Sequence, residues 1–327
     1  FMKKEEYLRK LKFQLIDLPG EDLEQIEDFY EELILDGIEQ GYTEDEVIAR
    51  LERPEDVAEK IRAEYGGLVV YTAHGKSKEE KQGYESVDQI HTVRVESENM
   101  RIRIRTVESG PVRILFQPRE GQDMVNFKEE DGVFSFEHRR KSNSYLDWLS
   151  HFFDTQVLIL ELPMNFAGNL WVRTKNSSVS VSGLGNLSLG EFISNNGKIH
   201  VKNSHIEKLA VQANNGKIDL SNLMGMELEA SSGNGLITAR ECRFTERLVM
   251  QTQNGAVTGK NLIGDNIPMQ TCNGFVTGNI IGNEKDYNIE SSTKNGFNNL
   301  ENVSSPERSK KLRAKTHNGR IQIEFTM

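Results

Sequence analysis

Asn-Gly pairs recur at a nearly constant interval through the second half of the chain, and no other feature of the sequence constrains the fold as strongly. The pairs begin at positions 196, 215, 234, 254, 273, 295 and 318, so the intervals run from 19 to 23 residues. Asn176, followed by Ser177, stands 20 residues before the first pair and is a degenerate copy. A period of this length is typical of solenoid proteins, in which each repeat buries its apolar face by stacking on the next.

The residues around each Asn predict one coil per repeat. Positions six, four and two before the Asn carry apolar or small residues, and these positions share one face of a strand. Gly190 interrupts the first of these columns, and Asn298 interrupts a column of Val and Ile three positions after the Asn. Ordinary hairpins would need only local turns, without equal spacing and matched columns. We therefore predict a mostly β fold, a single-stranded parallel β-helix of about eight coils of about 20 residues.

The Asn-Gly pairs are expected to form the turns of this solenoid. Gly and Asn adopt positive φ at low cost, which suits a tight turn. Stacked Asn side chains are expected to hydrogen-bond from coil to coil. The expected turn ladder consists of Asn176, Asn196, Gly197, Asn215, Gly216, Asn234, Gly235, Asn254, Gly255, Asn273, Gly274, Asn295, Gly296, Asn318 and Gly319.

Helical periodicity dominates the start of the chain. Apolar residues at helical spacing, interrupted by Pro and Gly, predict four short helices between residues 3 and 66. Thr43 and Glu46 form a capping box at the start of the third helix, and Pro54 suits the first turn of the fourth.

This helical segment carries the excess negative charge of the chain. Residues 1–65 hold 20 Asp and Glu against 9 Lys and Arg, whereas the remaining 30 acidic and 31 basic residues nearly cancel. An acidic segment repels nucleic acid, so we expect no nucleic-acid partner. A solvated helical face is the simpler explanation of the charge, and if the helices dock a partner, we expect a basic protein surface.

A polar linker, residues 68–89, and an irregular β region, residues 90–169, are expected between the helices and the repeats. The β region should start or cap the solenoid. Within it, an apolar stripe at helical spacing follows three basic residues. We expect this stripe either to cap the open end of the solenoid or to contact a membrane or a partner. Its residues are Tyr145, Trp148, Leu149, Phe152 and Phe153.

Two parts of the chain resemble known families. The run from Gly41 to Leu51, followed by Pro54 and by residues 57–61, resembles the small helical HAAS signalling domain, with Glu52 where that family often has Gly. Residues 157–163, residues 170–176 and the Asn-Gly columns resemble the bacterial putative-adhesin family of β-strand repeats, domain of unknown function 4097. The first resemblance implies a link to PadR-like transcription regulators. The second implies surface binding, and neither implies an enzymatic activity.

The sequence predicts no catalytic centre, metal site or cofactor. The outward position four after each Asn carries one acid in eight repeats, Asp219, so no pair of carboxylates is expected there. We interpret Asp219 and the neighbouring His200 as a surface pair. Cys242 and Cys272 have no metal-type spacing and lie in different columns, so we expect no disulfide. A Ser/His/Asp motif is not evident.

These observations predict four segments: acidic helices in 1–67, a linker in 68–89, irregular β structure in 90–169 and the solenoid in 170–327. We expect a non-enzymatic, adhesin-like binding or scaffold protein of the bacterial envelope or of envelope-stress signalling, with the helices docking a protein and with surface glycan or membrane as further contacts. A cytoplasmic regulator that binds a PadR-like transcription factor is the alternative, and a carbohydrate-active β-helix enzyme is least favoured. With neither a secretory signal nor a long apolar run, we expect cytoplasmic localisation, with a cell-surface or membrane-associated protein as the alternative.

Overall fold

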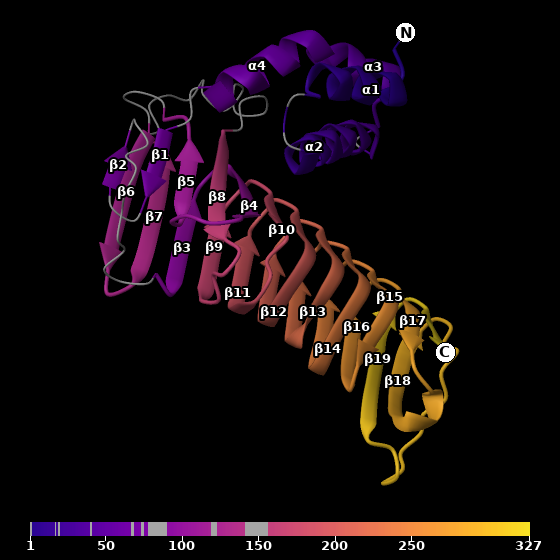
Figure 1. Cartoon of the computed structure of the whole chain (residues 1–327). Helices are drawn as coiled ribbons and strands as arrows, with labels where there is room; N and C mark the ends of the chain where they lie inside the picture. Colours follow the sequence, from indigo (N-terminus) through magenta and orange to yellow (C-terminus); the bar gives the residue numbers. More distant parts are fainter. Residues whose placement is uncertain are drawn as a thin grey trace. The chain divides into compact units, whose positions relative to one another are not determined.

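The computed structural model describes residues 2–16, 18, 20–39, 41–66, 69–72, 75–77, 90–118, 123–140 and 156–327. The chain divides into two compact units, Phe1–Leu68 and Val69–Met327, which are drawn in Figure 1. The first unit is helical and the second consists mainly of β-strands. Each unit has a hydrophobic core of its own.

The helical unit contains α1 (Lys4–Gln14), α2 (Gly20–Glu39), α3 (Glu44–Arg50) and α4 (Pro54–Gly66). The predicted capping box is confirmed at the start of α3. The backbone N–H of Glu46 donates to Thr43 Oγ1 at 3.3 Å, and the Glu46 carboxylate accepts from the backbone N–H of Thr43 at 2.8 Å. The core of this unit is formed by the apolar faces of the four helices and includes Tyr7, Leu8, Leu11, Leu15, Ile26, Ile34, Val47, Ile48, Val57 and Ala58.

The described part of the β unit contains twenty strands and one short 3-10 helix. They are β1 (Val69–Thr72), β2 (Gly75–Ser77), β3 (Thr92–Ser97), β4 (Arg101–Val107), β5 (Arg113–Phe116), β6 (Asp123–Glu130), β7 (Val133–Arg140), β8 (Val157–Pro163), β9 (Asn169–Thr174), β10 (Val179–Ser182), β11 (Leu187–Ser194), β12 (Ile199–Ala213), β13 (Ile218–Ser232), β14 (Ile237–Thr252), β15 (Val257–Gly264), β16 (Asn266–Thr271), β17 (Val276–Ile281), η1 (Glu284–Asp286), β18 (Tyr287–Asn295), β19 (Lys310–Asn318) and β20 (Ile321–Thr326).

Apart from the coil of Asn295, which has a strand only before its Asn, each coil of the Asn ladder has one strand segment before its Asn and one after it, and equivalent segments of neighbouring coils pair in parallel (Figure 1). For example, Ile199 is in register with Ile218, which is in register with Ile237. All three side chains are fully buried, as the predicted apolar columns require. The predicted fold class, a mostly β parallel solenoid preceded by a small helical unit, is therefore confirmed.

The expected polar linker begins with β-structure. Strand β1 pairs antiparallel with β2 and with β5. Residues 69–72, Val-Val-Tyr-Thr, are β-branched or aromatic and favour strands. The prediction from sequence places this short run in the linker because the residues that follow it are strongly polar and dominate the composition of the segment. Residues 78–89 of the expected linker lie outside the described part of the chain.

The first coil in the sequence is not the first coil of the stack. Strand β3 pairs in parallel with β7 on one side and with β9 on the other. Strand β4 lies in the same way between β8 and β10. The region expected to be irregular, residues 90–169, therefore contains a regular coil, formed by β3 and β4 and inserted between two coils that come later in the sequence.

The order is also exchanged at the other end of the stack. Strand β19 lies between β16 and β18, and β20 pairs with β17. The coil of Asn318 therefore stacks on the coil of Asn273, and the coil of Asn295 lies beyond it. Stacking in sequence order, which the repeat period implies, holds at neither end. The apolar columns are alike in most coils and do not specify which coil follows which.

The coil of Asn295 closes the stack with polar contacts. Ser291 and Asn298 stand in positions that most other coils fill with apolar residues, and Asn298 Nδ2 donates to Ser291 Oγ at 2.9 Å. Asn302 folds back and accepts hydrogen bonds from the backbone N–H and the hydroxyl of Ser291. Solenoids need a polar terminal coil. Asn298, which interrupts its predicted column, therefore marks the end of the stack.

Candidate functional site

The Asn residues of the coils form one continuous ladder of side-chain hydrogen bonds. Each Asn donates its Nδ2 to Oδ1 of the Asn in the preceding coil of the stack, at 2.7–2.8 Å. The ladder runs in the order Asn99, Asn176, Asn196, Asn215, Asn234, Asn254, Asn273, Asn318 and Asn295. It brings together all the predicted Asn residues along one corner of the solenoid.

Asn99 is a member of this ladder that the sequence reasoning missed. Met100 follows it, so no Asn-Gly pair marks the position. The inward-facing positions that precede each ladder Asn are nevertheless recognisable before Asn99. Val93, Val95 and Ser97 stand six, four and two positions before Asn99.

The Gly after each Asn is required by close stacking of the coils and not by positive φ. The expected positive-φ turn is wrong for these glycines. Gly319, at 159°, is nearly extended, and the other six have no positive φ: Gly197, Gly216, Gly235, Gly255, Gly274 and Gly296. A Cβ on Gly216 would lie 1.9 Å from the carbonyl oxygen of Gly197, and a Cβ on Gly255 would lie 2.2 Å from that of Gly235. Glycine is therefore the residue that lets successive backbones approach at this corner.

Buried hydroxyl groups two positions before the Asn stabilise the same corner by hydrogen bonds to backbone carbonyl oxygens. Thr271 Oγ1 donates to the carbonyl oxygen of Gly255 at 2.7 Å, and Thr252 Oγ1 donates to that of Gly235 at 3.0 Å. Both Thr residues are buried. These hydrogen bonds satisfy polar groups that would otherwise be costly to bury.

Positive φ is found at a second corner, seven positions after the Asn. Gly183, Asn203, Asn222, Glu241 and Asn261 occupy this column with φ between 49° and 74°. Asn222 Nδ2 donates to Asn203 Oδ1 at 2.9 Å, so part of a second ladder forms there. Glu241 interrupts it, because a carboxylate has no N–H to donate. The sequence signal for this corner was the recurrence of Asn at 203, 222 and 261.

The apolar stripe expected to cap the solenoid or to contact a membrane lies outside the described residues. Its members are Tyr145, Trp148, Leu149, Phe152 and Phe153. The role of this stripe therefore stays a prediction.

A groove of about 590 Å³ lies on the outer face of the sheet, across β6, β7, β3, β9 and β11. These strands align their outward side chains in two rows. One row contains Lys128, Ser135, Arg94, Trp171 and Glu191, and the other contains Asn126, Glu137, Glu96, Arg173 and Ile193. Sequence reasoning missed this groove because its residues come from distant segments of the chain and share no local motif.

Trp171 stands in the groove with 37% of its surface exposed. The guanidinium carbon of Arg94 lies 5.8 Å from the centre of a Trp171 ring, within the range of a cation–π contact. Among the described residues, neither the Arg173 guanidinium nor the Glu191 carboxylate engages in an ion pair or a side-chain hydrogen bond. The groove therefore offers an aromatic ring and unengaged charged groups of both signs.

The structure also brings together Ser97, His138 and Asp123, a set that the sequence reasoning did not find. His138 Nε2 lies 3.1 Å from Asp123 Oδ1, and His138 Nδ1 lies 3.4 Å from Ser97 Oγ. The Ser97 hydroxyl also accepts from the backbone N–H of Met100, and Ser97 is 1% exposed. A nucleophile needs access to its substrate, so we interpret this set as a buried structural network.

The two residues of the expected pair, His200 and Asp219, are aligned on neighbouring strands. The Asp219 carboxylate is buried and pairs with the Arg240 guanidinium at 2.8 Å and with Lys217 Nζ at 3.6 Å. Within the described parts of the chain, no three His, Cys, Asp or Glu side chains are grouped in a way that could hold a metal ion.

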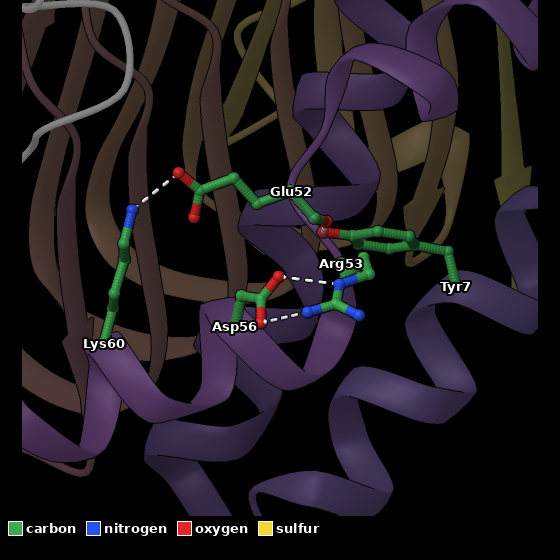
Figure 2. Close-up of polar contacts among 5 residues, drawn as sticks. All are labelled: Tyr7, Glu52, Arg53, Asp56 and Lys60. Atoms are coloured by element: carbon green, nitrogen blue, oxygen red, sulfur yellow. Dashed lines mark hydrogen bonds and ion pairs between the residues drawn. The ribbon is translucent and has the colours of Figure 1, made fainter.

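Polar contacts in the helical unit tie α1 to the connection between α3 and α4 (Figure 2). Tyr7 Oη donates to the backbone carbonyl of Glu52 at 2.8 Å, and Lys60 Nζ pairs with the Glu52 carboxylate at 2.6 Å. Burial raises the pKa of the Tyr7 hydroxyl. Glu52 therefore takes part in two stabilising contacts at the position where the resembled family often has Gly.

Most basic side chains of the helical unit are engaged within it. Ion pairs join Lys3 to Asp45, Lys4 to Glu31, Lys10 to Glu6, Lys12 to Glu27, Arg53 to Asp56 and Lys60 to Glu52. Arg50 lies over the ring of Tyr42 at 4.1 Å. Glu5, Glu55 and Glu59 are exposed and form no ion pair among the described residues. These three carboxylates are therefore presented to solvent.

The fold and the ladder define the class of the protein: a parallel β-solenoid preceded in the sequence by a small helical unit. The family model Toastrack DUF4097 matches residues 69–327, and the chain belongs to this family. The HAAS model matches residues 6–60, within the helical unit. Both family resemblances expected from the sequence are confirmed.

The chain has only weak similarity to a solved structure. A solved structure described as a "putative cell adhesion protein" from Clostridium sporogenes ATCC 15579 is 11% identical, with a TM-score of 0.21. That match covers 74% of this chain and 97% of the other. No curated protein matches the chain. Among the described helices, none combines the length and apolar character needed to cross a membrane.

Proposed function

We propose that this protein is a non-enzymatic binding and scaffold protein of the bacterial envelope or of envelope-stress signalling. In this proposal the solenoid is a rigid support that presents binding surfaces, and the helical unit docks a protein partner. The family assignment supports this reading, because the sequence resemblance to the adhesin-like repeats implies surface binding and does not imply an enzymatic activity. The buried position of Ser97 supports a non-enzymatic role as well.

The main support for the docking role is the excess negative charge of the helical unit. Many of its basic side chains are engaged in ion pairs within the unit, and carboxylates such as Glu55 and Glu59 remain exposed. These two residues are four positions apart on α4 and therefore lie on the same face of the helix. An acidic helical face attracts a basic protein surface, speeds the encounter and disfavours nucleic acid.

The test is a pull-down with the full chain as bait and extract of the native host as source. The double variant Glu55→Lys and Glu59→Lys reverses the charge of the α4 face. The matched control, Glu207→Lys and Glu246→Lys, makes the same charge change at exposed positions of the solenoid. We expect a basic protein that is retained by the wild type and the control but lost with the α4 variant and at high salt. Equal retention by all three baits would contradict the docking role.

A second candidate function rests on the HAAS match. The resemblance implies a PadR-like transcription regulator as the partner, which would make the protein a cytoplasmic regulator with the solenoid as a scaffold. Identification of the retained protein by mass spectrometry, together with fractionation of cells into envelope and cytosol, separates the two candidates. Recovery in the cytosol with a PadR-like regulator supports the second, and recovery with the envelope fraction supports the first.

A further inference from the structure

We propose that the groove around Trp171 binds a neutral saccharide chain. This inference concerns the solenoid alone and does not depend on the docking role of the helices. Its starting point is the combination found in the groove: an exposed aromatic ring, unengaged charged groups and a volume of about 590 Å³. Ligand sites of proteins commonly have volumes of this order and combine apolar surface with a few polar groups.

The charges in the groove argue against a charged polymer as ligand. Arg94, Lys128 and Arg173 contribute three positive groups, and Glu96, Glu137 and Glu191 contribute three negative groups. A nucleic acid or a sulfated polysaccharide would need a clear excess of positive charge. Side chains of both signs instead supply donors and acceptors together, which matches sugar hydroxyl groups, since each hydroxyl both donates and accepts.

The backbone of the groove argues against an extended peptide. Peptides that add to a sheet bind at an exposed edge, where unpaired N–H and C=O groups are available. Of the five strands that line the groove, β7, β3, β9 and β11 are each paired on both sides, and β6 has a described partner on one side only. On the face formed by the four central strands, recognition must therefore come from side chains.

The ring of Trp171 provides the surface on which a sugar can stack. The C–H face of a pyranose is apolar, whereas its rim carries hydroxyl groups, and the same division is found around Trp171. Glu191 and Arg94 are its neighbours on the two adjacent strands, and Arg173 follows two positions later on the same face. These groups can hydrogen-bond to the rim of a sugar that lies on the indole.

Native affinity electrophoresis of the full chain tests this proposal, with gels that contain hydroxyethylcellulose, glycol chitin, laminarin or heparin. We expect at least one of the three neutral polysaccharides to retard the wild type, and Trp171→Ala to weaken that binding about tenfold, as loss of an aromatic anchor does. Phe275→Ala is the matched control, because Phe275 is also an exposed aromatic residue but stands far along the stack. This control should bind like the wild type.

Two further measurements guard against a folding defect. Circular dichroism and thermal melting identify a Trp171→Ala variant that has lost its fold, and in that case Arg173→Ala and Glu191→Gln take its place. In a Trp148→Phe background, Trp171 is the remaining tryptophan, and its fluorescence should change on addition of the retarding polysaccharide. The proposal is overturned by the absence of retardation in all neutral gels, by retardation with heparin alone, or by equal weakening in Phe275→Ala.

Discussion

The side chain of Asn318 donates to Asn273 at 2.7 Å, although Asn295 is the next ladder residue in the sequence after Asn273. The coil that ends the repeat is therefore inserted one step before the end of the stack. The coil of Asn295 rests on it through the hydrogen bond from Asn295 Nδ2 to Asn318 Oδ1. Several consequences of this ladder and of its neighbouring columns can be measured.

Removal of residues 305–327 should release the coil before it as well. Without β19, strand β18 loses the partner with which it pairs along its length. We expect limited proteolysis of the truncated chain to cleave rapidly between Gly282 and Ser304, whereas the full chain is protected there. Equal protection of the two chains would show that β18 docks without β19.

The number of ladder hydrogen bonds at each Asn should determine the cost of its loss. Asn234 takes part in two, to Asn215 and from Asn254, whereas the terminal Asn295 takes part in one. At about 0.5–1.5 kcal/mol for each hydrogen bond, Asn234→Ala should lower the free energy of unfolding about twice as much as Asn295→Ala. Denaturation by urea, monitored by circular dichroism, measures both. A larger loss for Asn295→Ala would contradict the ladder as a stabilising element.

Substitution of Gly255 should be destabilising for every side chain, including Asn. A Cβ at this position would lie 2.2 Å from the carbonyl oxygen of Gly235. We expect Gly255→Ala, Gly255→Asn and Gly255→Val each to cost about 1–3 kcal/mol or more. Gly185→Ala is the control, because the nearest atom to its Cβ would be 3.7 Å away. If Asn were tolerated at 255 while Ala were not, a positive-φ requirement would explain the glycine better than close stacking.

Glu241→Asn should stabilise the solenoid. Glu241 has a φ of 54°, a left-handed conformation that Asn adopts more readily than Glu. The new amide would also stand between Asn222 and Asn261, where it can continue the second ladder. We expect a gain of about 1 kcal/mol in the free energy of unfolding. Glu246→Asn, at an exposed position without positive φ, should have little effect, and an equal gain there would point to charge as the cause.

The two thiols should differ sharply in reactivity. Both cysteines are free, as predicted, but Cys242 is buried and Cys272 is exposed. Burial raises the pKa of the Cys242 thiol to about 12. At pH 8 a thiol reagent should modify Cys272 quickly and reach Cys242 only after unfolding. Rapid modification of both thiols in the native protein would contradict the buried position of Cys242.

The same thiol makes stability depend on alkaline pH. The unfolded thiol loses its proton near pH 9 and the folded one only near pH 12, so the unfolded state binds fewer protons between these values. The stabilising contribution of the neutral thiol is complete below about pH 9 and is lost as the pH rises to about 12. Cys242→Ala should therefore lose less stability over this range than the wild type in parallel urea titrations.

The sequence predicted the coil because the period and the apolar columns are local properties of each repeat. It did not predict the order of the terminal coils, since stacking depends on residues far apart and each coil presents the same columns to its neighbours. Asn298 was visible as an exception, but its meaning as a terminal residue needed the pairing of β19 with β16 and β18. The groove was hidden for the same reason, because Arg94 and Trp171 meet only when β3 and β9 pair.

The exchanged order of the coils has a mechanical consequence. Tension applied to the β unit through β3 or through β19 would act on a strand that is hydrogen-bonded along both sides. Such a strand must slide past two neighbours at once, so two ladders share the load in shear, whereas an end strand in sequence order would peel from a single neighbour. Strands β3 and β19, in the first and last repeats, are thereby held against pulling in the same way as strands in the middle of the stack.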